Sequence, residues 1–192
     1  YRNPPEHALV LCADEKSQIQ ALDRTQPGLP LKKGRCGTMT HDYKRNGTTS
    51  LFAALNVATG EVTQEARARH TGDDFLAFLR RIDRVYPDQE LHVILDNVST
   101  HKTPDVRAWL EWHPRITFHF TPTSSSWLNL VERWFAELTR KKLQRSAHRS
   151  IKELTADLDA WVAAWNDDPK PFVWHKTADQ ILTSLKKYLT NL

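Results

Sequence analysis

The chain has few of the residues that build disulfide-bonded, membrane-spanning or nucleotide-binding proteins. Its 192 residues include two cysteines, Cys12 and Cys36, which are too few for a disulfide framework or a Cys-x-x-Cys metal pair. No run approaches the roughly 18 consecutive apolar residues of a transmembrane helix, and no secretory signal pattern opens the chain. A glycine-rich phosphate loop, an internal repeat and a low-complexity segment are also lacking. These absences favour a protein of a reducing compartment, the cytoplasm, whose chemistry is not that of a P-loop enzyme.

What the chain does have is a modest excess of positive charge. Lys and Arg number 27 against 23 Asp and Glu, and the formal net charge of +4 weakly favours a polyanionic partner. The hydrophobic fraction of 40% is enough for a real core, and 192 residues suit one domain with a small appendage. We expect a linker at 1–7, the main domain at 8–168 with a basic loop or arm at 23–47, and a helical tail at 169–192.

The hydrophobic pattern predicts strands and helices in an order typical of an α/β domain. Apolar or alternating runs predict strands, two of which form a hairpin around Thr59-Gly60. Apolar stripes and capping signals, including Thr103 and Ser150, predict helices. Antiparallel strands that precede a strand-helix-strand unit indicate a mixed sheet flanked by helices. The expected strands are 8–13, 15–20 (an edge strand), 48–57, 61–68, 91–96 and 116–120, and the expected helices begin at 71 and 103 and cover 127–144 and 150–165.

Two aspartates follow apolar runs that read as buried strands. The run 91–95 stops at Asp96, and the run 8–13 stops at Asp14. A buried carboxylate is costly unless a cation or hydrogen bonds receive it. Neighbouring strands could place the two acids side by side, where Mg²⁺, a hard ion that prefers oxygen ligands, would relieve their repulsion. Glu132, near the start of a helix, would add a third carboxylate, and two ions about 3.5–4 Å apart could then promote an in-line displacement at phosphate.

Taken singly, each of these acids has a simpler explanation. A strand-end aspartate is more often a turn residue or a helix cap than a metal ligand. A glutamate in the first turns of a helix commonly compensates the helix dipole. The combination of all three, with 35 residues between Asp96 and Glu132, is what favours a shared site.

The segments around the three acids together resemble a known family. The similarity is to the DDE transposases of the IS630/Tc1/mariner superfamily, and residues 14–24 resemble its bacterial IS630 branch. It spans about residues 8–166 and is specific in the combination of its motifs. The segments are Ala13-Asp14-Glu15-Lys16-Ser17, Leu95-Asp96-Asn97-Val98-Ser99-Thr100-His101-Lys102 and Ser126-Trp127-Leu128-Asn129-Leu130-Val131-Glu132-Arg133.

The resemblance implies a fold, a reaction and a set of partners. The fold is RNase H-like, with a five-stranded mixed sheet flanked by helices. Asp14, Asp96 and Glu132 are implied to be the catalytic residues and to bind Mg²⁺ or Mn²⁺, with two ions expected. The implied reaction is cleavage at transposon ends and strand transfer of the 3′-OH into target DNA, usually at TA. The expected partners are transposon-end DNA, target DNA and a second copy of the chain in a homodimer on paired ends, within the bacterial cytoplasm at the nucleoid.

Two features depart from the family pattern. The family often has proline directly after the asparagine of the third motif, whereas Leu130 follows Asn129 here. This change alters the loop before Glu132 but removes no ligand. Family members also carry an N-terminal helix-turn-helix region that recognises the terminal inverted repeats, and no such segment precedes Tyr1. We therefore expect a catalytic domain without its specificity module.

Three polar residues beside the acids are candidates for a supporting role in the site. Asn97 and His101 could orient a scissile phosphate or a water molecule. Asn97 could equally be a turn residue, and His101 a surface residue near a helix start. Asn129, in the loop before Glu132, is the third candidate.

Other acids near the triad are expected to point elsewhere. Glu15 should lie on the opposite strand face from Asp14 because neighbouring side chains alternate along a strand. Glu137 should lie well round the helix from Glu132. Because Glu132 follows a mobile serine-rich loop, we expect it to be the displaced residue in a metal-free state, with Asp14 and Asp96 in place.

Basic residues and one tryptophan are the candidate DNA contacts. Binding through the basic residues would weaken as salt rises, although a charge run is often only a solvated face. Trp127 could stack on a displaced base. The candidates are Lys32, Lys33, Arg35, Lys44 and Arg45 in the arm, and Trp127, Arg133, Arg140, Lys141, Lys142 and Arg145 around the helix that carries Glu132.

Two other functions stay open at this point. An RNase H-like nuclease would hydrolyse DNA by the same chemistry without strand transfer. A non-catalytic DNA-binding or assembly module would keep the fold alone, but the presence of all three carboxylates argues against it.

Overall fold

The computed structural model describes residues 7–24, 43–122, 125–173, 179–180 and 183. Within these ranges the strands form one five-stranded mixed sheet in the order β3-β2-β1-β4-β5. The pairs β1–β2 and β2–β3 are antiparallel, and the pairs β1–β4 and β4–β5 are parallel. The elements are β1 (Leu9–Arg24), β2 (Tyr43–Asn56), β3 (Val62–Arg67), α1 (Gly72–Val85), β4 (Leu91–Leu95), α2 (Pro104–Glu111), β5 (Ile116–Phe120), α3 (Leu130–Lys141) and α4 (Ile151–Asp167).

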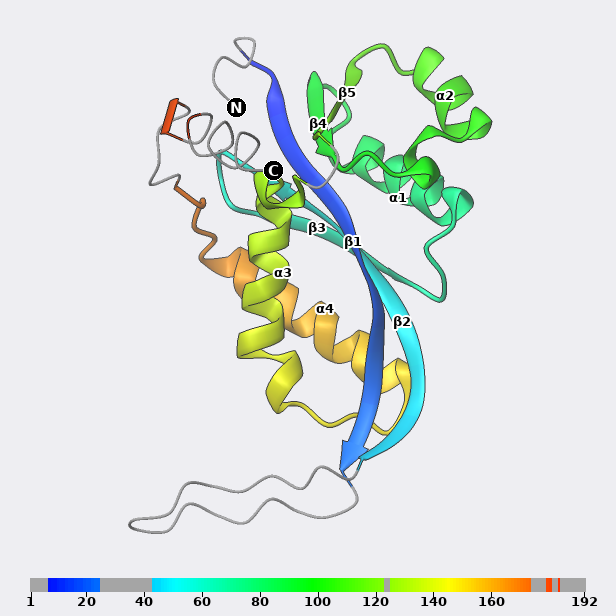
Figure 1. Cartoon of the computed structure of the whole chain (residues 1–192), viewed down its shortest axis with the longest axis vertical. Coiled ribbons are helices and arrows are strands. Elements are labelled where there is room, and N and C mark those ends of the chain that lie inside the picture. The colour runs from blue at the N-terminus through cyan, green and yellow to red at the C-terminus, as the bar shows by residue number, and fades with distance from the viewer. Residues whose placement is uncertain (1–6, 25–42, 123–124, 174–178, 181–182, 184–192) are drawn as a thin grey trace.

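Helices cover both faces of this sheet. α3 and α4 pack on one face, and α1 and α2 lie on the other (Figure 1). The first face buries Trp134 completely, and the second buries Phe52 and Phe78 to about the same degree. Each such side chain contributes on the order of 2 kcal/mol by leaving water. The predicted α/β architecture, a mixed sheet flanked by helices, is therefore confirmed.

The first strand is longer than the sequence predicts. β1 contains 16 residues, so Asp14 lies within it rather than at its end, and the separate edge strand expected at 15–20 is a continuation of it. The prediction was wrong because β1 keeps its antiparallel partner β2 beyond the point where its parallel partner β4 stops. The pairing with β2 shifts register between Lys16 and Ile19, where Gln18 has a left-handed backbone with φ of 53°. This bulge lets Cys12 before it and Ile19 after it reach the same core, on the α3–α4 face.

The basic arm is also shorter than the predicted range of 23–47. β2 begins at Tyr43, so Lys44 and Arg45 belong to a strand and pair with β1. The dipeptide Asn46-Gly47 reads as a turn in the sequence but lies inside β2, where the β1–β2 register shifts and Gly47 takes a φ of 107°. The candidate DNA contacts Lys32, Lys33 and Arg35 lie outside the described residues.

The helix starts follow the predicted capping signals. Thr71 caps α1 through a reciprocal capping box with Asp74. Thr103 caps α2 ahead of Pro104, and the Ser150 side chain accepts a hydrogen bond from the backbone of Glu153 at the start of α4. These caps fix where each helix begins and confirm the predicted starts.

The predicted helix at 127–144 is divided into three parts. A 3₁₀ helix, η2 (Ser126–Leu128), precedes α3, and another, η3 (Leu143–Arg145), follows it. The break falls at Asn129, whose backbone is extended. Leu130 occupies the first helical position, which also accepts proline, so the departure from the family motif leaves the helix start unchanged.

The ends of the chain leave two expectations untested. The linker at 1–7 and the helical tail at 169–192 lie largely outside the described residues, so the domain division stays a prediction. In the part of the chain that the structure describes, no helix has the length and apolar character needed to cross a membrane.

Candidate active site

Asp14 lies in β1, and Asp96 directly follows the neighbouring strand β4. The parallel pairing of β1 with β4 ends with Cys12 opposite Ile94. Two residues further along each chain come Asp14 and Asp96, so the register sets the two acids side by side. β4 has already ended, which leaves this stretch of β1 open on one side.

Asp14 is a buried carboxyl group with little to stabilise its negative charge. Its exposed fraction is 8%, and the backbone N–H of Glu15 donates to its Oδ1 at 2.8 Å. Burial, followed by the charge of Asp96, raises the pKa of Asp14 to about 7, and the hydrogen bond from Glu15 opposes this only in part. Glu132 also contributes to the shift, which means that all three predicted acids interact electrostatically. A bound cation would relieve this accumulation of negative charge.

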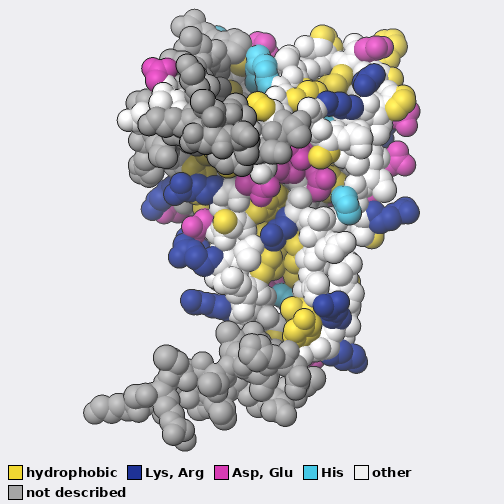
Figure 2. Space-filling model, viewed as in Figure 1, with side chains coloured by type: hydrophobic (Ala, Val, Ile, Leu, Met, Phe, Trp, Pro, Cys, Tyr) yellow, Lys and Arg dark blue, Asp and Glu magenta, His cyan; other side chains and the backbone are white. Residues whose placement is uncertain are grey.

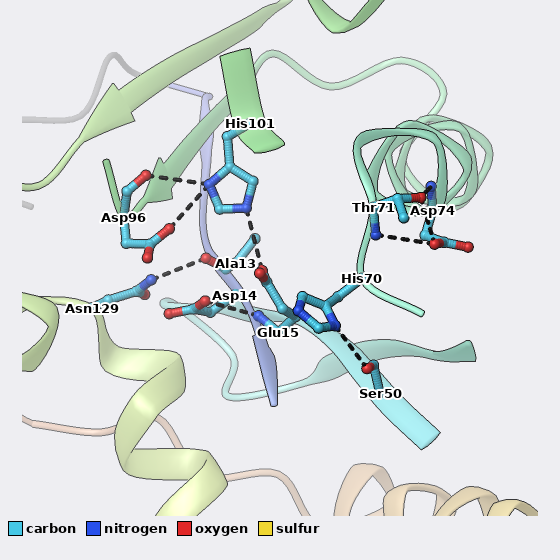
Figure 3. Close-up of polar contacts among 10 residues, drawn as sticks. All are labelled: Ala13, Asp14, Glu15, Ser50, His70, Thr71, Asp74, Asp96, His101 and Asn129. Carbon is cyan, nitrogen blue, oxygen red and sulfur yellow. Dashed lines mark hydrogen bonds and ion pairs between the residues drawn. The ribbon is translucent and has the colours of Figure 1, made fainter. Parts of the chain in front are cut away.

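Asp96 is held by a histidine from the segment that follows it. The 3₁₀ helix η1 (Ser99–Lys102) follows β4 and places His101 next to Asp96 (Figure 3). His101 Nδ1 lies 3.2 Å from the backbone carbonyl of Asp96 and 3.0 Å from its Oδ1. The contact with Oδ1 is an ion pair without hydrogen-bond geometry, since Oδ1 is buried and accepts no hydrogen bond.

His101 is enclosed in the fold rather than exposed on the surface. Its exposed fraction is 1%, and its ring packs on Phe75 with the centroids 4.3 Å apart. Its second nitrogen, Nε2, lies 3.3 Å from Glu15 Oε2. Burial would lower the pKa of His101, but contacts with Asp96 and Glu15 outweigh it and raise the pKa to about 9. The histidine is therefore a cation at neutral pH, and the alternative of a surface residue was wrong.

Asn129 joins the start of α3 to β1. Its side chain is almost fully buried, and Nδ2 donates to the Ala13 carbonyl at 3.0 Å. Its own carbonyl accepts from the backbone N–H of Glu132 at 3.1 Å, so the same residue begins the helix that carries Glu132. Asn129 Oδ1 is buried without a hydrogen-bond partner. The residue predicted as a supporting group thus connects β1, which carries Asp14, with α3, which carries Glu132.

Glu132 is the outermost of the three acids. It lies in the first turn of α3 and is the most exposed of the three acids. The burial that remains raises its pKa, Lys16 opposes this rise, and Asp96 and Glu15 add to it. Its influence on the pKa of Asp14 is smaller than that of Asp96. Asp14 and Asp96 therefore form the inner pair, and Glu132 approaches them from the neighbouring helix.

The acids fit a divalent cation in chemistry, although they do not form a closed set of ligands. Acidic side chains gather near the middle of the face shown in Figure 2, with Lys and Arg spread around them. Among the described residues, no three His, Cys, Asp or Glu side chains are close enough together to hold a metal ion. Carboxylate oxygens are the ligands that a hard divalent ion prefers, and a cation beside Asp14 would offset the burial and the Asp96 charge that raise its pKa. Asp14 and Asp96 would hold such an ion, and Glu132 would need to move toward it.

The remaining predicted supporting residue, Asn97, directly follows Asp96 in the chain. Asn97 is exposed, and its Oδ1 accepts a hydrogen bond from Lys102 Nζ. Both interpretations of Asn97, as a turn residue and as a group that orients a phosphate or water, stay predictions.

The basic residues of α3 lie away from Glu132 with one exception. Arg140 and Lys141 both pair with Glu137, and Lys142 pairs with Asp157. Eight residues, or about 12 Å of helix, separate Glu132 from Arg140, and Arg145 lies further still, in η3. These charges gather at the C-terminal end of α3 and in the residues after it, and their roles as DNA contacts stay predictions.

Two candidate DNA contacts lie close to Glu132 in the chain. Trp127 in η2 is 44% exposed, and Arg133 follows Glu132 directly, with its guanidinium 5.3 Å from the ring centroid of Phe172. Their roles as DNA contacts stay predictions, as do those of Lys44 and Arg45.

Glu15 is the residue of this site that sequence reasoning set aside. The alternation rule correctly placed it on the face opposite Asp14, but that face is where His101 lies. No periodicity in the sequence indicates that η1 packs on the face of the sheet that α1 and α2 cover. The only signal in the sequence for a role of Glu15 was its carboxylate directly after the proposed ligand Asp14.

Comparison with known proteins supports the same identity. The family model described as DDE superfamily endonuclease matches residues 9–155. An IS630 insertion element 39 kDa protein of Shigella sonnei is 29% identical over 89 residues, which are 46% of this chain and 26% of that protein. This chain thus matches about a quarter of the length of that curated relative.

Solved structures share the fold at low sequence identity. The Mos1 mariner paired end complex with Mn superposes with a TM-score of 0.60 at 22% identity, over 83% of this chain and 49% of that one. The catalytic core domain of BIV integrase superposes with a TM-score of 0.52 at 13% identity, over 93% and 97% of the two chains. The predicted RNase H-like fold of transposase and integrase catalytic cores is confirmed. With the family match over most of its length, the chain belongs to the DDE superfamily endonucleases.

Proposed function

We propose that the chain carries out divalent-metal-dependent cleavage of DNA at transposon ends and transfer of the resulting 3′-OH into target DNA. The observation that carries this proposal is the proximity of Asp14 and Asp96: each follows the paired stretch of β1 and β4 by two residues, and the Asp96 charge raises the pKa of Asp14. The buried Asp14 and the approach of Glu132 from α3 add to it. Such a group of carboxylates is costly to keep together without a cation.

Each acid has a distinct part in this proposal. Asp14 and Asp96 are the inner metal ligands, and Glu132 completes the site when it moves inward. When bound there, Mg²⁺ or Mn²⁺, as two ions, would activate the attacking oxygen and stabilise the leaving oxygen in an in-line displacement. Asn129 keeps the start of α3, and with it Glu132, close to β1. The Mn in the Mos1 paired end complex is in keeping with this choice of metal.

The proposed partners are transposon-end DNA, target DNA at TA steps and a second copy of the chain. The paired end state of the Mos1 relative is the basis for the dimer. The net charge of +4 and the exposed Arg140 and Lys141 suit a phosphate backbone, with affinity that falls as salt rises. Trp127, exposed just before α3, offers a surface for an unstacked base. We place the reaction in the bacterial cytoplasm at the nucleoid, where such DNA is found.

Joining of DNA ends is the expected activity that separates a transposase from a nuclease. The 192-residue chain is incubated with a labelled duplex that has a free 3′-OH, a supercoiled plasmid rich in TA steps, and Mg²⁺ or Mn²⁺. We expect label to appear in the plasmid, because the same carboxylates serve a 3′-OH nucleophile as readily as water. Gel electrophoresis with and without EDTA measures this.

The other outcomes are equally informative. Shortened duplex or nicked plasmid without joined label would support the RNase H-like nuclease in place of the transposase. Neither product in the presence of metal, from protein that still binds DNA, would contradict an active catalytic domain.

A further inference from the structure

A fourth carboxylate, that of Glu15, contacts the site from the opposite face of β1. Glu15 lies on the face of β1 opposite Asp14, and its side chain is 13% exposed. Its Oε2 lies 3.3 Å from His101 Nε2, while Nδ1 of the same ring lies 3.0 Å from Asp96 Oδ1. One imidazole thus links the carboxylate of Glu15 to that of Asp96 (Figure 3).

The linking ring has little freedom to turn. Both of its nitrogens are engaged, and Nδ1 contacts the backbone as well as the side chain of Asp96. The ring is packed on Phe75 and has an exposed fraction of 1%. A rotation of the ring would break its contacts with Glu15 and with Asp96 at once. The contact with Glu15 therefore helps to fix the ring, and the ring in turn restrains Asp96.

We propose that Glu15 is a positioning residue that, through His101, fixes the Asp96 carboxylate in the orientation that receives a divalent ion. This inference rests on the proposed function of the Asp14–Asp96 pair. Groups that orient metal ligands from behind typically change metal affinity or activity by about 10–100-fold when they are removed. Glu15 itself touches neither DNA nor the metal in this proposal.

Charge alone and positioning predict opposite results for one of the two residues. Removing Glu15 takes away a negative charge near the site, and removing His101 takes away a positive one. By charge alone, loss of Glu15 would weaken Mn²⁺ binding and loss of His101 would strengthen it. If the two residues position Asp96, both losses weaken binding.

The test measures Mn²⁺ affinity directly, from the electron paramagnetic resonance signal of free Mn²⁺ titrated with the 192-residue chain. We expect Glu15→Ala and His101→Ala each to raise the Kd by about tenfold. The Kd of the double variant should be close to that of either single variant, because Glu15 and His101 act on Asp96 through the same series of contacts. Glu15→Gln, which keeps an oxygen acceptor for His101, should lose less than Glu15→Ala. Glu111→Gln, an exposed glutamate of α2, is the matched control and should not change the Kd.

The outcomes separate this inference from the proposed function. Asp96→Asn is measured in the same titration, and if it leaves the Kd unchanged, the proposed metal site itself fails. If Asp96→Asn weakens binding while both Glu15 variants stay within twofold of the unchanged chain, only the positioning role fails. Tighter binding by His101→Ala would likewise overturn it. Thermal unfolding verifies that each variant is folded, and Glu15→Gln decides the question if an alanine variant is not.

Discussion

Replacing Asp96 with asparagine, or Glu132 with glutamine, is expected to reduce metal-dependent DNA cleavage by about 10²–10³-fold. Stabilisation of the transition state by a bound metal is worth several kcal/mol, and each 1.4 kcal/mol corresponds to about a factor of ten in rate. Both substitutions keep the size of the side chain and remove a negative charge. Single-turnover cleavage of a labelled duplex at saturating Mg²⁺ measures the loss.

Glu137→Gln is the matched control for Glu132→Gln. Glu137 lies on the same helix but pairs with Arg140 and Lys141, so its neutralisation should leave the rate within about twofold. DNA binding without metal should be nearly unchanged in all three variants. Full activity of Asp96→Asn would show that the reaction does not use this pair of acids. Equal losses of cleavage rate for Glu132→Gln and Glu137→Gln would show that the net charge of α3, and not the position of Glu132, determines the rate.

Replacing Asp14 with asparagine is expected to stabilise the metal-free chain at neutral pH. The pKa of Asp14 is raised to about 7 in the folded chain, against 3.8 for an ordinary aspartate. An acid with a raised folded pKa costs no stability below the unfolded pKa, where both states are protonated. The cost grows as pH rises from about 4, because the unfolded chain releases the proton first, and it is complete above about 7. With Asp14 only 8% exposed, the difference corresponds to roughly 2–4 kcal/mol at pH 8.

Urea unfolding with EDTA present, at pH 4, 6 and 8, measures this effect. The advantage of Asp14→Asn should be smallest at pH 4, should increase toward pH 7 and should then level off. Added Mn²⁺ should reverse the order, since a ligand that binds only the folded state stabilises the unchanged chain. A stabilisation independent of pH would mean that the charge of Asp14 is not its cause. An unchanged order in Mn²⁺ would contradict the role of Asp14 as a ligand.

The inner pair of acids is the part of the site that a sequence could indicate. Asp96 follows a short apolar run that is a strand in the structure, and the register of parallel strands brings Asp14 beside it. The sequence misplaced Asp14 at a strand end because local composition does not report how far β2 continues as a partner. Its role as a neighbour of Asp96 survives this error, because the parallel pairing alone sets their relative level.

The contacts that His101 makes with Asp96 and Glu15 could not be predicted from the local sequence. His101 has no apolar periodicity around it, and its burial follows from the way η1 folds under β4 onto Phe75. Glu15 obeyed the alternation rule and was dismissed for that reason, although the opposite face also holds a charged partner. Glu132 was indicated chiefly by family resemblance, because an acid in the first turn of a helix is common in any protein.

The most direct test of the metal site is the location of Mn²⁺ by anomalous diffraction from crystals of the chain grown with MnCl₂. The account predicts an anomalous peak in contact with the carboxylates of Asp14 and Asp96, with the side chain of Glu132 moved toward it. Peaks only at other residues, with Asp14 and Asp96 free of Mn²⁺ at a concentration that supports DNA cleavage, would contradict it.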